Sequence, residues 1–390
     1  MRVLIVLREF YCPSKPVGGA ERQAIKLAEI LIAKGITVTV VTGQWDWGQP
    51  RREKLNNVPV HRHFTGWEMF NVRGLRRLSL YIYLLTLSLY LIKRRSEYDL
   101  IHCHSAMFGA AVAVLTGKWL HRTTLVRAMA SGAWGDVKRM HGARNMLGTR
   151  WMLSKLKNAD CLVALNKEVV TELIATGVNS ERIVCLPNGV ETERIKSKTD
   201  YKIVGGVRVT FVGRLHPQKG VDVLLSAFKK AQENQPQLSW RLTLVGEGEL
   251  CSILEALAQQ LAIKQMVRFL GQVTDPFPIL SQSDIFVLPS MSEGMSNALL
   301  EAMAHGLPCI ATDIAGNNQV ITHNENGLLV QPDDDDLAAA IVSLALSRDL
   351  RERLGRKAAQ TVKKNYALDN VADQYIALYT RLLQGNADAR

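Results

Sequence analysis

Short apolar runs alternate with amphipathic helical patterns along almost the whole chain. Val3–Leu7 is one such run, and apolar positions at helical spacing then fill 20–34 and stop at Gly35. Further strands are expected at 37–42, 58–64, 100–102, 124–128, 161–164, 183–186, 207–212, 242–245, 267–270, 285–288 and 307–311, and helices at 106–117, 221–234, 250–261, 298–305 and through 337–383. This βαβ order predicts parallel sheets covered by helices on both faces.

A polar, lysine-rich segment at 191–206 interrupts the alternation and ends in two glycines. It predicts a linker between a first domain over 1–190 and a second over 207–367, followed by a helix at 368–390 that can pack on the first domain. Ligands of such sheets bind at the carboxyl ends of the strands. We therefore expect a site in a cleft between two facing sheets.

The net charge and the cysteine pattern limit the classes of binding partner and the cellular setting. The formal net charge of +12 suits nucleic acid, a membrane surface or a polyanionic substrate, but no recognition-helix pattern or zinc spacing supports nucleic acid. The six cysteines form no CxxC pair and lie mostly in apolar runs, which favours a reduced, cytoplasmic setting. The first ten residues, MRVLIVLREF, are typical of a strand rather than a signal peptide.

The stretch Leu78–Ile92 is almost wholly apolar and is flanked by Arg76, Arg77 and the basic run 93–95. It is shorter than the roughly 20 residues that a membrane span needs. A buried core helix with basic ends is the first interpretation. A helix lying on an anionic lipid surface is the alternative.

The stretch SEGMSNALLEAMAHGLPCIAT, over 292–312, places Glu293 in a loop and Glu301 about one turn inside the following helix. Backbone N–H groups at that helix start can hold an anion, and carboxylates accept hydrogen bonds from hydroxyls. An anion site between two hydroxyl acceptors suits a nucleotide-sugar. Alternatively, Glu293 is a solvated loop residue and Glu301 a surface position.

Three glycine- or cation-bearing turns follow expected strands. Arg214 and Lys219 flank a proline-containing loop, where two cations suit a diphosphate. Gly18 and Gly19 precede a helix and would let backbone approach a phosphate or sugar, and the turn beginning at Gly246 is a third place where backbone can meet a ligand. Solvated cations and flexible loops are the alternatives. Dinucleotide and P-loop motifs are missing.

His102 and His104 end another expected strand. Because side chains alternate along a strand, we expect one to point inward and one toward the cleft, with His104 as the cleft residue; a core or loop histidine without a role is the alternative. Small residues in RAMASG, over 127–132, suit a wall of the cleft. The acidic run Asp333–Asp336 is interpreted as a helix N-cap rather than a metal site.

The order of these pieces is more specific than any one of them. GGAER, an H-x-H strand end, PNGV, FVGRLHPQKG, VGEGE and the 292–312 stretch occur in sequence, and the chain closely resembles family 4 of the glycosyltransferases, which are retaining enzymes. The resemblance implies an α/β chain of the GT-B fold. In that fold, two doubly wound Rossmann-like domains face a central cleft, and C-terminal helices can cross back to the first domain.

The resemblance also implies roles for individual residues. Arg214 and Lys219 would hold the donor diphosphate, Glu301 the ribose hydroxyls, and Glu293 the donor sugar, with His104 near sugar and acceptor. Backbone contacts to the donor would come from Gly18, Gly19, Gly246, Gly294, Met295, Ser296 and Asn297. Met295 and Ser296 depart from the Phe-Gly that the family often has, which puts the backbone contacts there in doubt.

The implied reaction moves a sugar from a nucleotide-sugar, a UDP-sugar by resemblance, to an acceptor hydroxyl with retention. We expect no metal and no cofactor beyond the co-substrate. The acceptor is expected to be a glycan or a lipid-linked glycan, used in surface polysaccharide synthesis at the inner membrane face. A nucleotide-sugar 2-epimerase-like isomerase and a non-catalytic nucleotide-sugar-binding protein are the alternatives.

Overall fold

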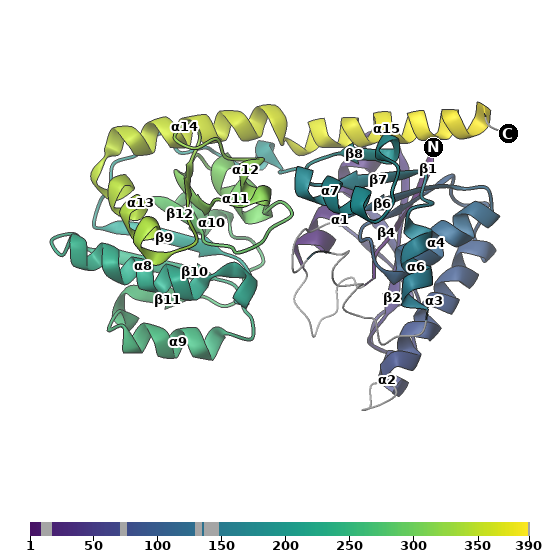
Figure 1. Cartoon of the computed structure of the whole chain (residues 1–390), viewed down its shortest axis with the longest axis horizontal. Coiled ribbons are helices and arrows are strands. Elements are labelled where there is room, and N and C mark those ends of the chain that lie inside the picture. Colours follow the sequence, from purple (N-terminus) through teal and green to yellow (C-terminus); the bar gives the residue numbers. More distant parts are fainter. Residues whose placement is uncertain (9–17, 71–75, 129–134, 136–147, 389–390) are drawn as a thin grey trace. The chain divides into compact units, whose positions relative to one another are not determined.

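The computed structural model describes residues 1–8, 18–70, 76–128, 135 and 148–388. The chain divides into two compact units (Figure 1): unit 1 comprises Met1–Gly189 with Leu368–Arg390, and unit 2 comprises Val190–Ala367. Each unit is built on one mainly parallel sheet. The predicted class, two doubly wound α/β units, is confirmed.

The sheet of unit 1 has the order β3-β4-β2-β1-β5-β6-β7-β8. Its strands are β1 Arg2–Val6, β2 Thr37–Gln44, β3 Arg52–Leu55, β4 Val58–Phe64, β5 Leu100–Cys103, β6 Thr123–Arg127, β7 Cys161–Ala164 and β8 Ile183–Cys185. Strand β3 was not predicted from the sequence; it pairs antiparallel with β4 through a turn at Asn56 and Asn57, both in the left-handed region. Its sequence, REKL, contains a single apolar residue, so no alternating apolar pattern marks this short, charged strand at the sheet edge.

Helices cover both faces of this sheet. One face carries α1 Gly19–Ala33 and α15 Leu368–Asp388, whose buried Tyr375 and Tyr379 join the core with Leu31. Figure 1 shows α15, drawn in yellow, lying along unit 1 although it follows all of unit 2 in the chain. The other face carries α3 Arg76–Lys93, α4 Phe108–Trp119, α6 Thr149–Leu156 and α7 Lys167–Ala175. The described part of unit 1 also contains two shorter helices, α2 Trp67–Phe70 and η2 Ser180–Arg182.

Helix α3 has one buried and one exposed apolar face. Tyr83, Leu84, Leu87 and Leu91 are buried, whereas Leu78, Tyr81, Leu85 and Leu89 are 39–61% exposed. The expected buried core helix is therefore confirmed for one face of α3, and the exposed apolar side chains of the other face depart from it. Among the described residues, no helix has the length and apolarity that crossing a membrane requires.

The sheet of unit 2 is parallel throughout and has the order β11-β10-β9-β12-β13-β14. Its strands are β9 Val207–Val212, β10 Trp240–Val245, β11 Val267–Phe269, β12 Ile285–Leu288, β13 Cys309–Thr312 and β14 Leu328–Val330. Its helices are η3 Thr192–Arg194, η4 Pro217–Lys219, α8 Val221–Asn234, α9 Cys251–Gln260, η5 Lys264–Met266, α10 Phe277–Ser281, α11 Asn297–Ala304, α12 Ala315–Asn318, α13 Asp334–Leu346 and α14 Arg348–Asn365. Asp333 caps α13 by accepting from the backbone of Asp335 and Asp336, which confirms the N-cap interpretation.

The segment 191–206 is not a free linker but part of unit 2. The Tyr201 side chain is buried, and its hydroxyl donates to the Gly306 carbonyl at 2.9 Å. Lys198 donates to the Ser283 carbonyl at 2.6 Å and lies 3.2 Å from an Asp284 oxygen. The polar composition that suggested a linker serves these fixed hydrogen bonds instead.

Candidate functional site

The strand order in the sheet of unit 2 reverses between β9 and β12. After β9 the chain adds strands on one side of the sheet, and after β12 it adds them on the other. Ligands of open α/β sheets bind at such switch points, beyond the carboxyl ends of the strands. The loop carrying Arg214 and Lys219 follows β9, and Glu293 follows β12. Candidate residues from two distant stretches of sequence therefore lie where the topology places a ligand.

Lys219 and Glu293 form an ion pair across this switch point. Their side chains are only 17% and 9% exposed, and the Ser290 hydroxyl donates to the same Glu293 oxygen at 2.8 Å. Partial burial strengthens a charge pair and holds its geometry. The pair gives unit 2 a preorganised cation beside a carboxylate, as binding of a phosphate and a sugar hydroxyl requires.

The two loops that carry this pair are bonded to each other. The Gln218 side chain donates to the Ser292 carbonyl, and the Met291 N–H donates to the Gln218 carbonyl, both at 2.8 Å. Gly220 has a left-handed φ of 59°, and a Cβ there would overlap the Pro289 carbonyl oxygen. Sequence reasoning missed the supporting roles of Ser290 and Gln218, although their positions beside a strand end and a candidate cation were a usable signal.

Arg214 and Glu301 lie on the same two segments. Arg214 is exposed and makes no ion pair with any residue that the structure describes. Glu301 is half-buried in α11, which begins after Ser296; the Ser296 hydroxyl accepts from the Leu299 N–H at 3.3 Å. This N-cap explains a serine where the family often has glycine. Contacts of Arg214 and Glu301 with a donor stay predictions.

Gly246 has a structural reason to be glycine. Its φ is 137°, and a Cβ would overlap the Gly213 carbonyl oxygen. Its N–H donates to the Gly271 carbonyl at 2.8 Å. The close approach seen here is between neighbouring strand ends, and contact of Gly246 with a ligand stays a prediction, as it does for the buried turn residues Gly294 and Met295.

The sheet of unit 1 has its own switch point, between β1 and β5. Gly18 is the N-cap residue of α1 and Gly19 its first residue, on the chain segment that follows β1. His104 follows β5 directly. Most of the RAMASG stretch, from residue 129 on, lies outside the described residues.

His104 lies in a buried polar cluster rather than at an open strand end. It is 1% exposed, and its ring centroid is 4.6 Å from that of His102. The expectation that the two rings point to opposite faces is wrong, because residues two apart on a strand share a face. Burial lowers the pKa of His102 to about 3, and burial with the neighbouring His102 and Arg127 lowers the pKa of His104 well below its usual value.

Arg127, the last residue of β6, extends this cluster. It donates to His104 Nδ1 at 3.5 Å and to the side-chain oxygen of Asn188. His102 Nδ1 is 2.7 Å from the hydroxyl of Tyr379 on α15. Sequence reasoning named neither Arg127 nor Asn188 as a site residue, although both belong to motifs that it singled out after strands.

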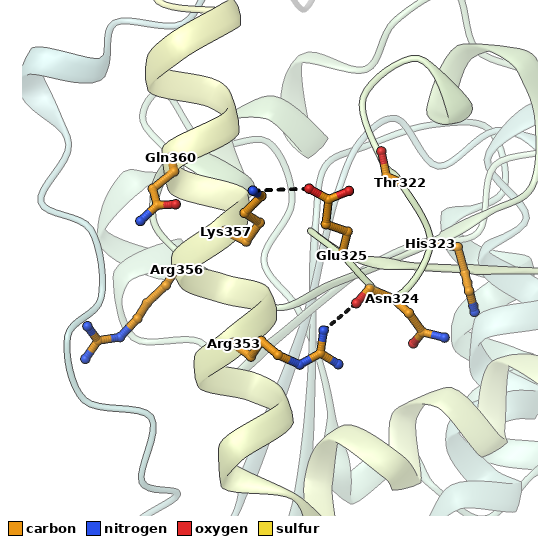
Figure 2. Close-up of a pocket in the computed structure, with 8 residues that line it drawn as sticks. All are labelled: Thr322, His323, Asn324, Glu325, Arg353, Arg356, Lys357 and Gln360. Carbon is orange, nitrogen blue, oxygen red and sulfur yellow. Dashed lines mark hydrogen bonds and ion pairs between the residues drawn. The ribbon is translucent and has the colours of Figure 1, made fainter.

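A separate pocket of about 520 Å³ lies between α14 and the loop over 322–325 (Figure 2). Arg353 donates to the Asn324 carbonyl, and Lys357 is 3.1 Å from a Glu325 oxygen. Arg356 pairs with Glu352 at 2.6 Å. Each cation of this pocket therefore has an acceptor already, and none of the residues predicted for the donor site lines it.

Comparison with known proteins places both units in one class. Residues 17–194 match the model described as Glycosyltransferase Family 4, and residues 206–347 match that described as Glycosyl transferases group 1. A UDP-Gal:alpha-D-GlcNAc-diphosphoundecaprenol alpha-1,3-galactosyltransferase of Escherichia coli is 33% identical over 64% of this chain and 67% of its own. An uncharacterized glycosyltransferase of Methanocaldococcus jannaschii is 29% identical over 97% of this chain and 98% of its own.

Solved structures show the same fold. A sucrose-phosphate synthase from Thermosynechococcus elongatus superposes with a TM-score of 0.80 at 22% identity, over 98% of this chain and 99% of its own. Anabaena HepE in complex with UDP-glucose gives 0.77 at 20% identity, over 98% and 100%. The fold is that of the GT-B glycosyltransferases. The chain belongs to glycosyltransferase family 4, as the resemblance of its motifs predicted.

Proposed function

We propose that this glycosyltransferase transfers a sugar from a UDP-sugar to an acceptor hydroxyl with retention of the anomeric configuration and without a metal ion. The observation that carries the proposal is the partly buried Lys219–Glu293 pair at the switch point of unit 2. It joins a phosphate-binding cation to a hydroxyl acceptor. The exposed Arg214 supplies a second cation from the same loop.

The acceptor oxygen would form a bond to the anomeric carbon as the bond from that carbon to the diphosphate oxygen breaks on the same face. The acceptor hydroxyl proton passes to the departing phosphate oxygen, so atoms and charge balance. Lys219 and Arg214 stabilise the charge that develops on the diphosphate. Glu293 accepts hydrogen bonds from the sugar and orients it.

Relatives support an acceptor in polysaccharide or lipopolysaccharide synthesis. The Escherichia coli relative is named for a diphosphoundecaprenol acceptor, and a Rhizobium meliloti relative, 27% identical over 93% of this chain, for lipopolysaccharide core biosynthesis. We propose a lipid-linked glycan acceptor for this chain, used at the cytoplasmic face of the membrane.

Incubation with a panel of nucleotide-sugars and lipid-linked acceptors tests the reaction. Nucleoside diphosphate release that requires acceptor, and NMR coupling constants that show the donor's configuration in the product, are expected. Conversion of donor alone into an epimer would favour the isomerase instead. Binding without turnover of any donor would favour a non-catalytic protein. Lys219→Ala should lower turnover by orders of magnitude.

Helix α3 offers a surface for the membrane part of this proposal. Leu78, Tyr81, Leu85 and Leu89 recur every three or four residues and form one exposed apolar stripe. Lys93 and Arg95 beyond its end are exposed, whereas Arg94 pairs with Glu97 at 2.6 Å. The side chains of Arg76 and Arg77 lie outside the described part of the chain. Apolar side chains with cations at the end suit a surface of anionic lipid.

Flotation with vesicles tests that surface. Binding is expected to anionic but not to neutral vesicles, and it should weaken as salt rises. Leu85→Gln with Leu89→Gln should lower it without changing donor binding in unit 2. Equal flotation of wild type and this variant at low salt, or none for wild type, would contradict the proposal.

A further inference from the structure

Unit 1 holds a cluster of buried polar side chains at the carboxyl ends of its strands. We call it the buried polar cluster. His104 follows β5, Arg127 ends β6 and Asn188 follows β8, and they are 1%, 3% and 6% exposed. Tyr375 of α15 stacks on His102 beside them, with ring centroids 5.4 Å apart.

The contact with Arg127 selects the tautomer of His104. A guanidinium can only donate, so His104 Nδ1, 3.5 Å away, accepts and carries no proton. The ring proton then lies on Nε2. The lowered pKa of His104 keeps the ring neutral at neutral pH. His104 Nε2–H is consequently a donor, and it has no partner in the described structure.

Arg127 brings a positive charge that the described residues do not balance. Its hydrogen bonds go to His104 and Asn188, both uncharged, and it forms no ion pair with a described carboxylate. Its Nε is also buried without a partner, as is the hydroxyl of Tyr375. A buried charge without a counter-ion is costly. A ligand that accepts hydrogen bonds and carries negative charge is the chemical complement of these groups.

We propose that the buried polar cluster binds an oxyanion of the acceptor substrate, namely a phosphate in a lipid-linked acceptor, through Arg127 and His104. The carboxyl ends of β5 and β6 are where a sheet of this type receives ligands. Arg127 suits phosphate oxygens because its N–H groups can donate in parallel. The identity of the ligand as acceptor rests on the proposed function; the binding of an oxyanion does not.

Titration of the full chain with inorganic pyrophosphate tests the site, with the imidazole nitrogens followed by NMR. His104→Gln identifies the His104 signals by their loss. In wild type we expect a protonated Nε2 and an unprotonated Nδ1, and both should shift in a saturable way. The titration is run with saturating UDP, so that anion sites for the donor diphosphate are occupied. No shift at His104, loss of the shift when UDP is present, or a proton on Nδ1 would overturn the proposal.

Variants separate the cluster from general electrostatics. Arg127→Met should weaken the binding of pyrophosphate at least tenfold, whereas Arg182→Met, which removes an exposed arginine of unit 1, should leave it unchanged. Arg127→Lys keeps the charge and supplies a second test if the methionine variant does not fold. Equal weakening by Arg182→Met would overturn the proposal. These measurements need no turnover. A failure of the oxyanion site is therefore read from binding, and a failure of the proposed function from nucleoside diphosphate release.

Discussion

Replacement of Lys219 by methionine tests whether the Lys219–Glu293 pair is an energetic unit. The change keeps the apolar stem but leaves the Glu293 side chain, 9% exposed, with Ser290 and without its cation. Breaking a fully buried pair costs about 3–5 kcal/mol, and an unsatisfied buried polar group about 1–3 kcal/mol. Because Glu293 keeps Ser290 as a donor and is slightly exposed, we expect Lys219→Met to lower the free energy of unfolding by about 2 kcal/mol.

The double variant Lys219→Met with Glu293→Gln, compared with the two single variants, gives the coupling free energy between the two side chains. Removing both charges should cost less than the sum of the single changes by roughly 1–2 kcal/mol. Lys230→Met is the matched control, since the Lys230 side chain is 36% exposed and pairs with Asp334 and with the exposed Asp335 of α13. Exposed ion pairs contribute little to stability, so this control should leave the free energy of unfolding nearly unchanged.

The assay must report unit 2 alone, because two units need not unfold together. Trp240 is the single tryptophan of residues 190–367 and is 3% exposed. Incorporation of fluorotryptophan makes its ¹⁹F signal a probe of urea unfolding in that unit. Additive single-variant effects, within about 0.5 kcal/mol, would refute the reasoning, as would a control loss equal to that of Lys219→Met.

Three further predictions concern the donor, the metal and pH. Glu301→Gln should weaken donor binding by about 1–3 kcal/mol with unchanged unfolding; calorimetric titration checks this, and a lower melting temperature with normal binding would make Glu301 structural. Turnover should survive a chelator, and a strict requirement for added Mg²⁺ or Mn²⁺ would contradict the cation clamp. The folded-state pKa values of His102 and His104 lie below their unfolded values, so unit 1 should lose stability as pH falls from 6.5 toward 3. Equal urea midpoints of unit 1 at pH 7 and pH 5 would contradict this.

Periodicity and motif order predicted the two sheets and the stretch around Glu293 because both depend on local sequence. The switch point brings Lys219 to Glu293, and only their family resemblance placed them in one site beforehand. The buried polar cluster of unit 1 was less accessible to prediction. Arg127 contacts His104 and Asn188 across strands β5, β6 and β8, and such partners depend on strand order rather than on spacing along the chain. The polar strand β3 carries too few apolar residues for its pattern to show.

The return of α15 to unit 1 has a consequence for synthesis on the ribosome. The chain leaves unit 1 after Gly189 and re-enters it at Leu368, so unit 2 is complete before unit 1. Val371, Tyr375 and Tyr379, which belong to the core on one face of the first sheet, are translated only after the whole of unit 2. Until they emerge, that face exposes apolar surface that invites chaperones and aggregation. A premature stop directly after unit 2, before Val371, would thus leave one face of the unit 1 sheet uncovered while leaving unit 2 intact.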